Sequence, residues 1–258
     1  MINSDEILRL ARINKLKPHQ QEKHYAQTLV LSGIYSYIVD ELVFKGGTAL
    51  FFFRGLDRFS EDLDFTQTAE YDHNKLKTSI SEMLGLIGAT HEIKDVKSVL
   101  GKKIKVKIEG PLYKLPINKT VVDIDISLRK DIVLKPEILE VIPMYDDVRP
   151  FTVPVMKKEE TLAEKIRAIT TRGLARDLYD TYFLLKKGTE LDPELVNKKL
   201  SMYNEKLDLK KFDASLIKIE KIWEPELGGL IPRVPPFKDV SAYVLSTVST
   251  KLNSQNPL

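Results

Sequence analysis

The spacing of apolar residues changes its period near Lys157, and this change limits the folds open to the 258-residue chain. Before this position, several segments alternate apolar and polar side chains, as half-buried β-strands do. After it, apolar residues recur at helical spacing as far as residue 251. The sequence therefore predicts an α+β fold with two regions, residues 1–157 with strands and N-terminal helices and residues 158–258 with helices.

The individual elements follow from the same spacing and from the positions of glycine and proline. In the first region, helices are expected at 4–12, 18–38 and 72–87, with a further helix after Thr48. Strands are expected at 42–44, 62–65, 91–99, 103–109, 121–128, 138–142 and 151–156. In the second region, helices are expected at 158–172, 176–187, 192–203, 208–222 and 237–251, with a loop at 224–236.

A glycine pair follows the first expected strand. Gly46 and Gly47 end the apolar run 42–44, and Thr48 is expected to cap the next helix. Glycines let backbone N–H groups approach triphosphate oxygens, and Thr48 would add a hydroxyl donor. The segment lacks the Gly-Lys-Ser/Thr ending of a P-loop. The pattern predicts a glycine turn that binds phosphate.

Acidic side chains occur on two of the expected strands. Asp62 and Asp64 are two residues apart and so share one face of their strand, as do Asp123 and Asp125 on a later strand. A solvated polar face is the simple explanation. Beside the glycine turn, however, three such carboxylates form an oxygen cage suited to Mg²⁺. Two Mg²⁺ ions held there would activate a hydroxyl and neutralise a leaving pyrophosphate.

The expected strand 103–109 places Lys103, Lys105 and Lys107 on one face. A basic stripe of this kind suits an RNA backbone. Lysines on an edge strand also prevent unwanted strand pairing, and this is the slightly favoured interpretation. Aromatic residues are not concentrated beside the stripe, so base stacking has no support in the sequence.

The composition excludes several other functions. The chain has no Cys, which excludes disulfides and thiolate chemistry, and its four His are scattered without zinc-ligand spacing. The net charge of +3 gives a weak overall field. No apolar run approaches the roughly 20 residues of a membrane span, and the first residues lack a signal pattern. We therefore expect a cytoplasmic protein that does not bind membranes.

Four sequence blocks carry a resemblance to a known family. They are 44–50 (FKGGTAL), 58–65 (RFSEDLDF), 164–168 (EKIRA) and 172–180 (RGLARDLYD). These blocks resemble the signature of the AbiEii/AbiGii toxin family of nucleotidyltransferases, within the DNA polymerase β-like superfamily. Gly47-Thr48 stands where the superfamily has Gly-Ser. The resemblance spans roughly residues 20–187 and implies a small mixed sheet with flanking helices, joined to a helical region that contributes to the active-site cleft.

The resemblance also implies metal ligands. The family's metal-binding pair falls on Asp62 and Asp64. The third acid is best matched by Asp125, because it precedes Ile126 and Ser127 as the family's strand acid does, while Asp123 is the alternative on the same face.

Later blocks of the family supply a lysine and an aspartate needed for activity. They fall on Lys165 and on Asp177 or Asp180. On helix geometry alone, Lys165 is more simply explained as a snorkelling lysine and Asp177 as a partner of the helix dipole. In the family interpretation, Lys165 neutralises the triphosphate or a developing oxyanion, and Arg58 is a candidate for the same task.

The implied activity is transfer of a nucleotide from an NTP to an acceptor hydroxyl. Family members act in toxin–antitoxin or phage-defence systems, and some add nucleotides to the 3′ end of tRNA. We therefore expect Mg²⁺ as cofactor, an NTP and tRNA as substrates, and a cognate antitoxin as partner. Two alternatives are nucleotidylation of a protein or small-molecule hydroxyl, and a catalytically idle binding module whose acids are structural.

Overall fold

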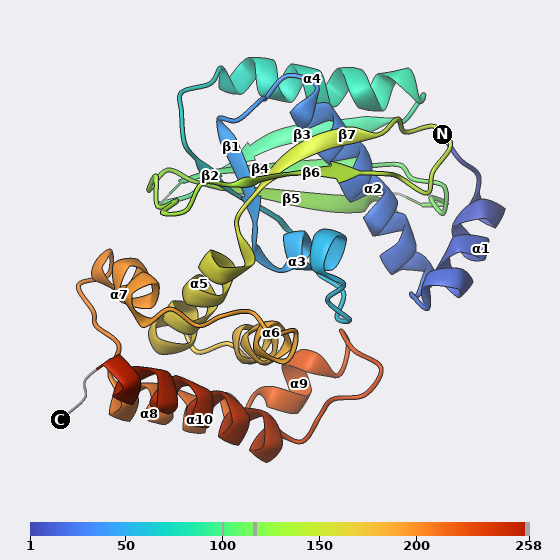
Figure 1. Ribbon diagram of the computed structural model, residues 1–258. Coiled ribbons are helices and arrows are strands. Elements are labelled where there is room, and N and C mark those ends of the chain that lie inside the picture. The colour runs from blue at the N-terminus through green and yellow to red at the C-terminus, as the bar shows by residue number, and fades with distance from the viewer. Residues whose placement is uncertain (100, 116–117, 256–258) are drawn as a thin grey trace. The chain divides into compact units, whose positions relative to one another are not determined.

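The computed structural model describes residues 1–99, 101–115 and 118–255 (Figure 1). The chain divides into two compact units. Unit 1 comprises residues 1–55, 60–132 and 136–155, and unit 2 comprises residues 56–59, 133–135 and 156–258. Residues 256–258, part of the expected helical region, lie outside the described residues.

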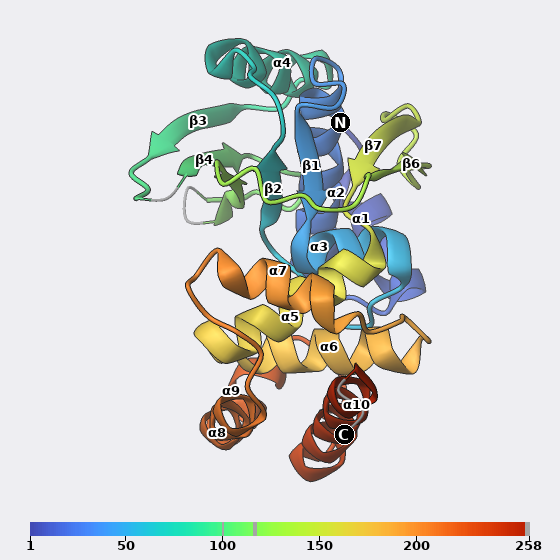
Figure 2. The ribbon, with the colours of Figure 1, turned by 60° about the vertical axis from the view of Figure 1, so that its left-hand side comes forward.

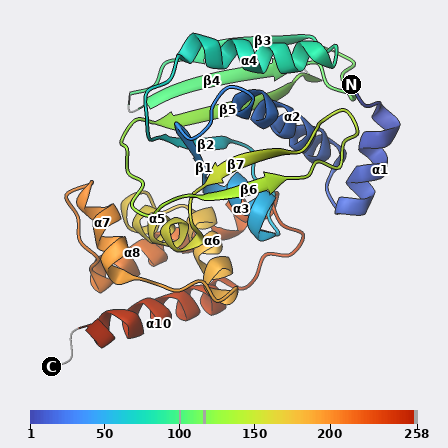
Figure 3. The same ribbon diagram turned by 45° about the horizontal axis from the view of Figure 1, so that its top comes forward.

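Within the described residues, unit 1 contains a seven-stranded sheet in the order β3-β4-β5-β2-β1-β7-β6, which Figure 3 shows from top to bottom. The strands are β1 (Leu42–Lys45), β2 (Leu63–Gln67), β3 (His91–Val96), β4 (Gly101–Ile108), β5 (Thr120–Ser127), β6 (Glu137–Val141) and β7 (Phe151–Val155). The pairs β1–β7 and β2–β5 are parallel, and the other pairs are antiparallel. The expected mixed sheet is therefore present.

Strand β4 lies inside the sheet. It pairs with β3 on one side and with β5 on the other, so the edges of the sheet are β3 and β6. The expectation that the lysines of β4 protect an edge is therefore wrong. Periodicity gives the faces of a strand, but it does not give the strand's neighbours.

Helices cover the apolar face of this sheet. The helices of unit 1 are α1 (Ser4–Asn14), α2 (Pro18–Tyr35), α3 (Gly46–Arg54) and α4 (His73–Leu86). Helix α2 packs against β5 and against α4, and α4 also contacts β3. Beneath them the alternate residues of β4 and β5 are buried, including Ile104, Val106 and Ile124. Because successive side chains of a strand point to opposite faces, the charged residues between them project from the other face.

Unit 2 is helical. Its helices are α5 (Lys158–Thr171), α6 (Ala175–Lys186), α7 (Pro193–Ser201), α8 (Leu209–Glu220), α9 (Trp223–Leu227) and α10 (Phe237–Gln255). Helix α6 packs against α5 and α10, as Figure 2 shows, and α5 also contacts α7 and α8. No helix in the described part of the chain is both long and apolar enough to cross a membrane.

Helix α9 corrects the expected loop at 224–236. Trp223 is 1% exposed, and its indole N–H donates to the carbonyl oxygen of Pro235 at 2.8 Å. The Glu226 carboxylate accepts from the backbone N–H of Ala175, at the start of α6. These contacts join residues distant in sequence, which explains why the local proline and glycine pattern did not indicate the helical turn.

A buried ion pair joins two helices of unit 2 to a connecting segment. Lys199 of α7 lies with its Nζ 2.6 Å from Oε1 of Glu160 in α5, and both side chains are almost fully buried. Glu160 also accepts hydrogen bonds from the backbone N–H groups of Val133 and Leu134 at 2.8 and 2.9 Å. One carboxylate therefore holds three parts of the unit together.

The Glu160→Ala variant should lower the free energy of unfolding by about 3–5 kcal/mol, because Lys199 then keeps a buried charge without this carboxylate. Urea unfolding followed by circular dichroism measures the loss. Glu159→Ala is the matched control, since the Glu159 side chain is 33% exposed and pairs only loosely with Lys158, at 3.9 Å. The control should lose at most about 1 kcal/mol. Equal losses in both variants would contradict this assignment.

Candidate active site

The centre of the site lies where β1 passes into α3. The strand ends at Lys45 and the helix begins at Gly46, so the expected glycine turn between them is absent. Gly46 has a φ of +75°, and a Cβ there would lie 2.4 Å from Oδ2 of Asp64. The missing side chain therefore leaves the space in which the Asp64 carboxylate lies.

Thr48 has a different contact from the one expected. It lies within α3, whose N-cap is Lys45, and therefore does not cap the helix. Its side chain is fully buried, and the hydroxyl donates to the carbonyl oxygen of Asp62. The Thr48 hydroxyl thus positions the backbone of an acidic residue, and its expected role as a donor to phosphate stays a prediction.

Gln27 of α2 holds the segment that precedes this acid. Its Nε2 donates to the carbonyl oxygens of Ser60 at 3.0 Å and Glu61 at 2.9 Å, and the side chain is fully buried. Asp62 itself lies one residue before β2, whereas the sequence placed it in the strand. Gln27 could not be predicted as a site residue. The residues around it in α2 carry no pattern that indicates a hydrogen bond to a segment more than thirty residues later.

Parallel pairing brings acids of two strands together. Asp64 of β2 and Asp125 of β5 are direct Cα partners, and Asp123 lies on the same face of β5 two residues earlier. Burial raises the pKa of Asp62 above 3.8, and the nearby charges of Asp123 and Asp125 add to this shift, against the opposing effects of Lys23 and Lys103. Each of the four acids thus lies close to at least one of the others.

Lysines of β4 compensate the charge of the β5 acids. The Nζ of Lys103 lies 3.0 Å from Oδ2 of Asp125, and the Nζ of Lys105 lies 3.6 Å from Oδ1 of Asp123. The hydrogen bond to Asp125 is the main cause that raises the pKa of Lys103 above 10.5. These pairs depend on the register of β4 against β5, which the sequence does not indicate.

A buried lysine accompanies Asp64. Lys45 is its Cα partner on β1 and is 9% exposed. The Nζ of Lys45 lies 4.0 Å from Oδ2 of buried Asp131, whose other carboxylate oxygen accepts from the Thr66 hydroxyl at 2.9 Å. This side of the site therefore combines two acids with one buried cation. Asp131 lies beyond β5 in a segment without periodicity, so no local pattern indicated it.

Within the described ranges, no three acidic or histidine side chains are placed to hold one metal ion in their present arrangement. Two features nevertheless suit a cation. The donors are all carboxylate oxygens, which are the ligands that Mg²⁺ prefers. Oδ1 of Asp123 is also buried and accepts no hydrogen bond. The Nζ of Lys105 lies 3.6 Å from this oxygen, beyond hydrogen-bond distance, so a bound cation would supply the close contact that the oxygen lacks.

Unit 2 gathers the remaining predicted residues into one buried cluster. Arg58 donates from Nε and Nη2 to the two carboxylate oxygens of Asp180, at 2.6 and 2.7 Å. The Nζ of Lys165 lies 2.7 Å from Asp180 and 3.1 Å from Asp177. Arg172 donates to both oxygens of Asp177 at 2.8 Å. Three cations therefore share two carboxylates, which leaves the cluster with a net charge of +1.

This cluster is held in its charged form. Burial opposes the charge of Asp180, but Arg58 and Lys165 outweigh it and keep the pKa of that carboxyl below 3.8. Burial likewise opposes the charge of Asp177, whose pKa is held well below its usual range by Lys165 and Arg172. Lys165 is only 7% exposed, so it does not extend to solvent as a snorkelling lysine does. Arg172 was not among the expected site residues.

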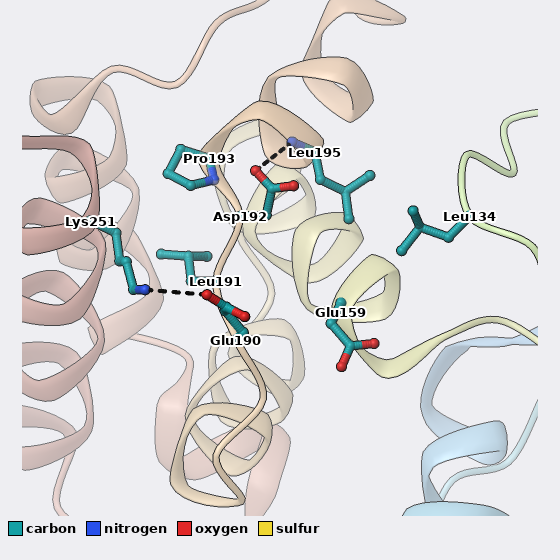
Figure 4. Close-up of a pocket in the computed structure, with 8 residues that line it drawn as sticks. All are labelled: Leu134, Glu159, Glu190, Leu191, Asp192, Pro193, Leu195 and Lys251. Carbon is teal, nitrogen blue, oxygen red and sulfur yellow. Dashed lines mark hydrogen bonds and ion pairs between the residues drawn. The ribbon is translucent and has the colours of Figure 1, made fainter. Parts of the chain in front are cut away.

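A pocket of about 400 Å³ also lies in unit 2 (Figure 4). None of the expected site residues lines it. Of its acids, Asp192 caps α7 by accepting from the backbone N–H of Leu195, and Glu190 lies 3.7 Å from Lys251. Two of its acids thus have partners within the unit, and we assign the pocket no part in the site.

The Gly46→Ala variant should be less stable than Gly55→Ala. Both glycines have positive φ, so each alanine costs about 1–2 kcal/mol in the left-handed region. At Gly46 the new Cβ also meets the Asp64 carboxylate, whereas nothing lies within 4 Å of the equivalent position at Gly55. Thermal unfolding of the two variants measures the difference. Equal losses in Tm would show that Asp64 does not depend on this space.

Acid should weaken unit 2 through Asp177 and Asp180. Their folded pKa values lie below 3.8, so their ion pairs contribute full stability above about pH 4 and lose it as pH falls through the folded pKa values. Urea unfolding between pH 6 and 2 measures this loss. In Arg172→Gln the folded pKa of Asp177 rises towards its unfolded value, so the acid-dependent loss should be smaller and should be complete at higher pH. The neighbouring exposed residue gives the control, Arg176→Gln, which should follow the wild type.

Comparisons with known proteins identify a family for this chain. The family model described as "Nucleotidyl transferase AbiEii toxin, Type IV TA system" matches residues 34–245. A search of curated proteins found no match.

Solved structures share the fold at low sequence identity. JHP933 from Helicobacter pylori is 20% identical with a TM-score of 0.62, covering 93% of this chain and 96% of that chain. A putative nucleotidyltransferase from H. pylori is 20% identical with a TM-score of 0.63, covering 94% and 100%. The nucleotidyltransferase toxin MenT4 from Mycobacterium tuberculosis H37Rv is 19% identical with a TM-score of 0.68, covering 98% and 90%.

The family model spans most of the chain and includes the blocks at 44–50 and 58–65 that carry the resemblance. It also includes the strands that bear Asp64 and Asp125 and the helices that bear Lys165 and Asp180. The chain therefore belongs to the AbiEii family of nucleotidyltransferase toxins.

Proposed function

We propose that the chain transfers a nucleotide from an NTP to the 3′ end of tRNA, as the toxin of a toxin–antitoxin pair with a cognate antitoxin. The observation that carries this proposal is the pairing of Asp64 with Asp125 on adjacent parallel strands beside Gly46. Family membership supplies the reaction class, and the resemblance described above supplies tRNA as the acceptor.

The carboxylates fit a divalent cation. We assign Asp62, Asp64 and Asp125 as the ligands of Mg²⁺, with Asp125 preferred to Asp123 because it is the direct partner of Asp64. When bound, Mg²⁺ would supply positive charge to the triphosphate and lower the pKa of the attacking hydroxyl. Thr48 and Gln27 would keep the backbone around Asp62 in place, since both side chains are buried and bonded to that segment.

The start of α3 would bind the triphosphate. The first N–H groups of a helix have no partner within the helix, and they attract anions. Gly46 and Gly47 have no side chains to obstruct this end, and together with the backbone of Thr48 they form the first turn. Within unit 2, Lys165 remains the lysine that the family resemblance assigns to the reaction; Asp177 and Asp180 hold its charge, and Arg58 keeps Asp180 ionised.

Substitution of one proposed ligand tests the reaction. Asp64→Asn removes a negative charge at nearly constant volume, so transfer of α-³²P label from NTPs should fall by at least about 100-fold. The exposed residue Asp146, also in unit 1, gives the control Asp146→Asn, which should retain wild-type rates. Circular dichroism checks that both variants fold.

The acceptor is identified in the same assay. Purified tRNA, total RNA and total protein are offered separately with each of the four NTPs. The proposal expects label at the 3′ end of tRNA, which nuclease digestion from that end releases. Label on protein alone would replace tRNA with a protein hydroxyl as the acceptor. Full activity of Asp64→Asn would reject the proposed site.

A further inference from the structure

One face of the β3–β4 hairpin is rich in lysine. Lys103, Lys105 and Lys107 alternate along β4 with buried residues, and Lys94 of β3 is the direct Cα partner of Lys105 on the same face. Like charges directly opposite each other on neighbouring strands are destabilising. The repulsion between Lys94 and Lys105 therefore destabilises the sheet locally.

Edge protection does not explain the lysines of β4. Strand β4 is paired along its length with β3 and β5 and has no free edge. A lysine that blocks pairing belongs on an edge strand, where unpaired backbone groups would otherwise recruit another chain. Lys103 and Lys105 pair with the acids of β5, so Lys107 is the lysine of β4 whose charge neither pairing nor edge protection explains.

The lysine face also forms a hollow. A pocket of about 420 Å³ is lined by Glu92, Lys94, Asp95, Val96, Lys97, Lys105 and Lys107. Lysines outnumber acids by four to two in this lining. Lys94 is paired with Glu92, but among the described residues neither Lys97 nor Lys107 takes part in an ion pair. Glu92 lies opposite Lys107 and offsets part of its charge, so the lining keeps an excess of two positive charges.

The same face continues to the carboxylates. Lys105 lies opposite Asp123, and Lys103 lies opposite Asp125, on the neighbouring strand β5. Lysines two residues apart on a strand are separated by roughly 6.6 Å. A chain of phosphates lying over the hollow would thus continue along β4 to the acids that we propose as metal ligands, all within unit 1.

We propose that the lysine face, defined as Lys94, Lys97, Lys105 and Lys107, binds the phosphate backbone of the RNA acceptor and directs its 3′ end toward Asp125. This inference rests on the proposed function. The strands β3 and β4 contain no Phe, Tyr or Trp, so the face offers charge without base stacking. Binding is therefore independent of sequence and strongly dependent on salt.

The test removes three of these charges and leaves the lysines paired with Asp123 and Asp125 intact. The triple variant Lys94→Gln, Lys97→Gln, Lys107→Gln is compared with Lys210→Gln, Lys218→Gln, Lys221→Gln, which removes the same charge from exposed positions on and directly after α8. Fluorescence anisotropy measures the Kd of labelled tRNA at several salt concentrations. Circular dichroism checks folding.

The lysine-face variant should bind tRNA at least about 10-fold more weakly than wild type, and its salt slope should fall by about 2, since each lost phosphate contact contributes about 0.7. Its KM for the NTP should stay within about 2-fold of wild type. The control variant should keep tRNA binding within about 2-fold. An unchanged Kd and slope in the lysine-face variant would overturn the inference.

The outcomes separate this inference from the proposed function. If wild type labels tRNA and the lysine-face variant binds it normally, the reaction stands and only the lysine face is wrong. If wild type labels no RNA, the proposed function fails, and the anisotropy titration still decides whether the face binds RNA. If the variant loses labelling of a protein acceptor but binds RNA normally, the face belongs to a protein partner and the inference is wrong.

Discussion

The alternation of buried and outward-facing side chains along β4 and β5 is the constraint on which unit 1 depends. Helices α2 and α4 cover the face of the sheet that carries the buried apolar residues of β4 and β5. The residues between them, charged ones included, therefore lie together on the other face. The same rule that builds the core therefore also collects acids and lysines into a layer of opposite charges. A shift of one residue in either strand would bury that layer, so the register that stabilises the fold also preserves the site.

Much of the fold could be predicted because it follows from local periodicity. The positions of most strands and helices, the acids on β2 and β5 and the glycines after β1 all have signals within a few residues. What could not be predicted depends on contacts between distant segments. The Lys103–Asp125 pair needs the β4–β5 register, the hydrogen bonds of Gln27 need the path of a later turn, and helix α9 needs the packing around Trp223.

The two units handle charge differently. In unit 1 the acids lie at the surface of a sheet, where partly exposed lysines balance them and where an incoming cation or anion can compete. In unit 2 the cluster around Asp180 is buried and bonded on nearly every side, so its members have one arrangement. The acids of unit 1 can therefore exchange their ionic partners, while the cluster of unit 2 holds Lys165 in one position.

The segment 56–59 belongs to unit 2 although the chain on both sides of it belongs to unit 1. Its Arg58 is a partner of Asp180, more than a hundred residues later. A fragment that began at residue 156 would retain every helix of unit 2 but would leave this interior carboxylate short of its main counter-ion. A recombination that exchanged the helices of unit 2 alone would therefore keep this ion pair only if the incoming helices suited the Arg58 of the retained segment.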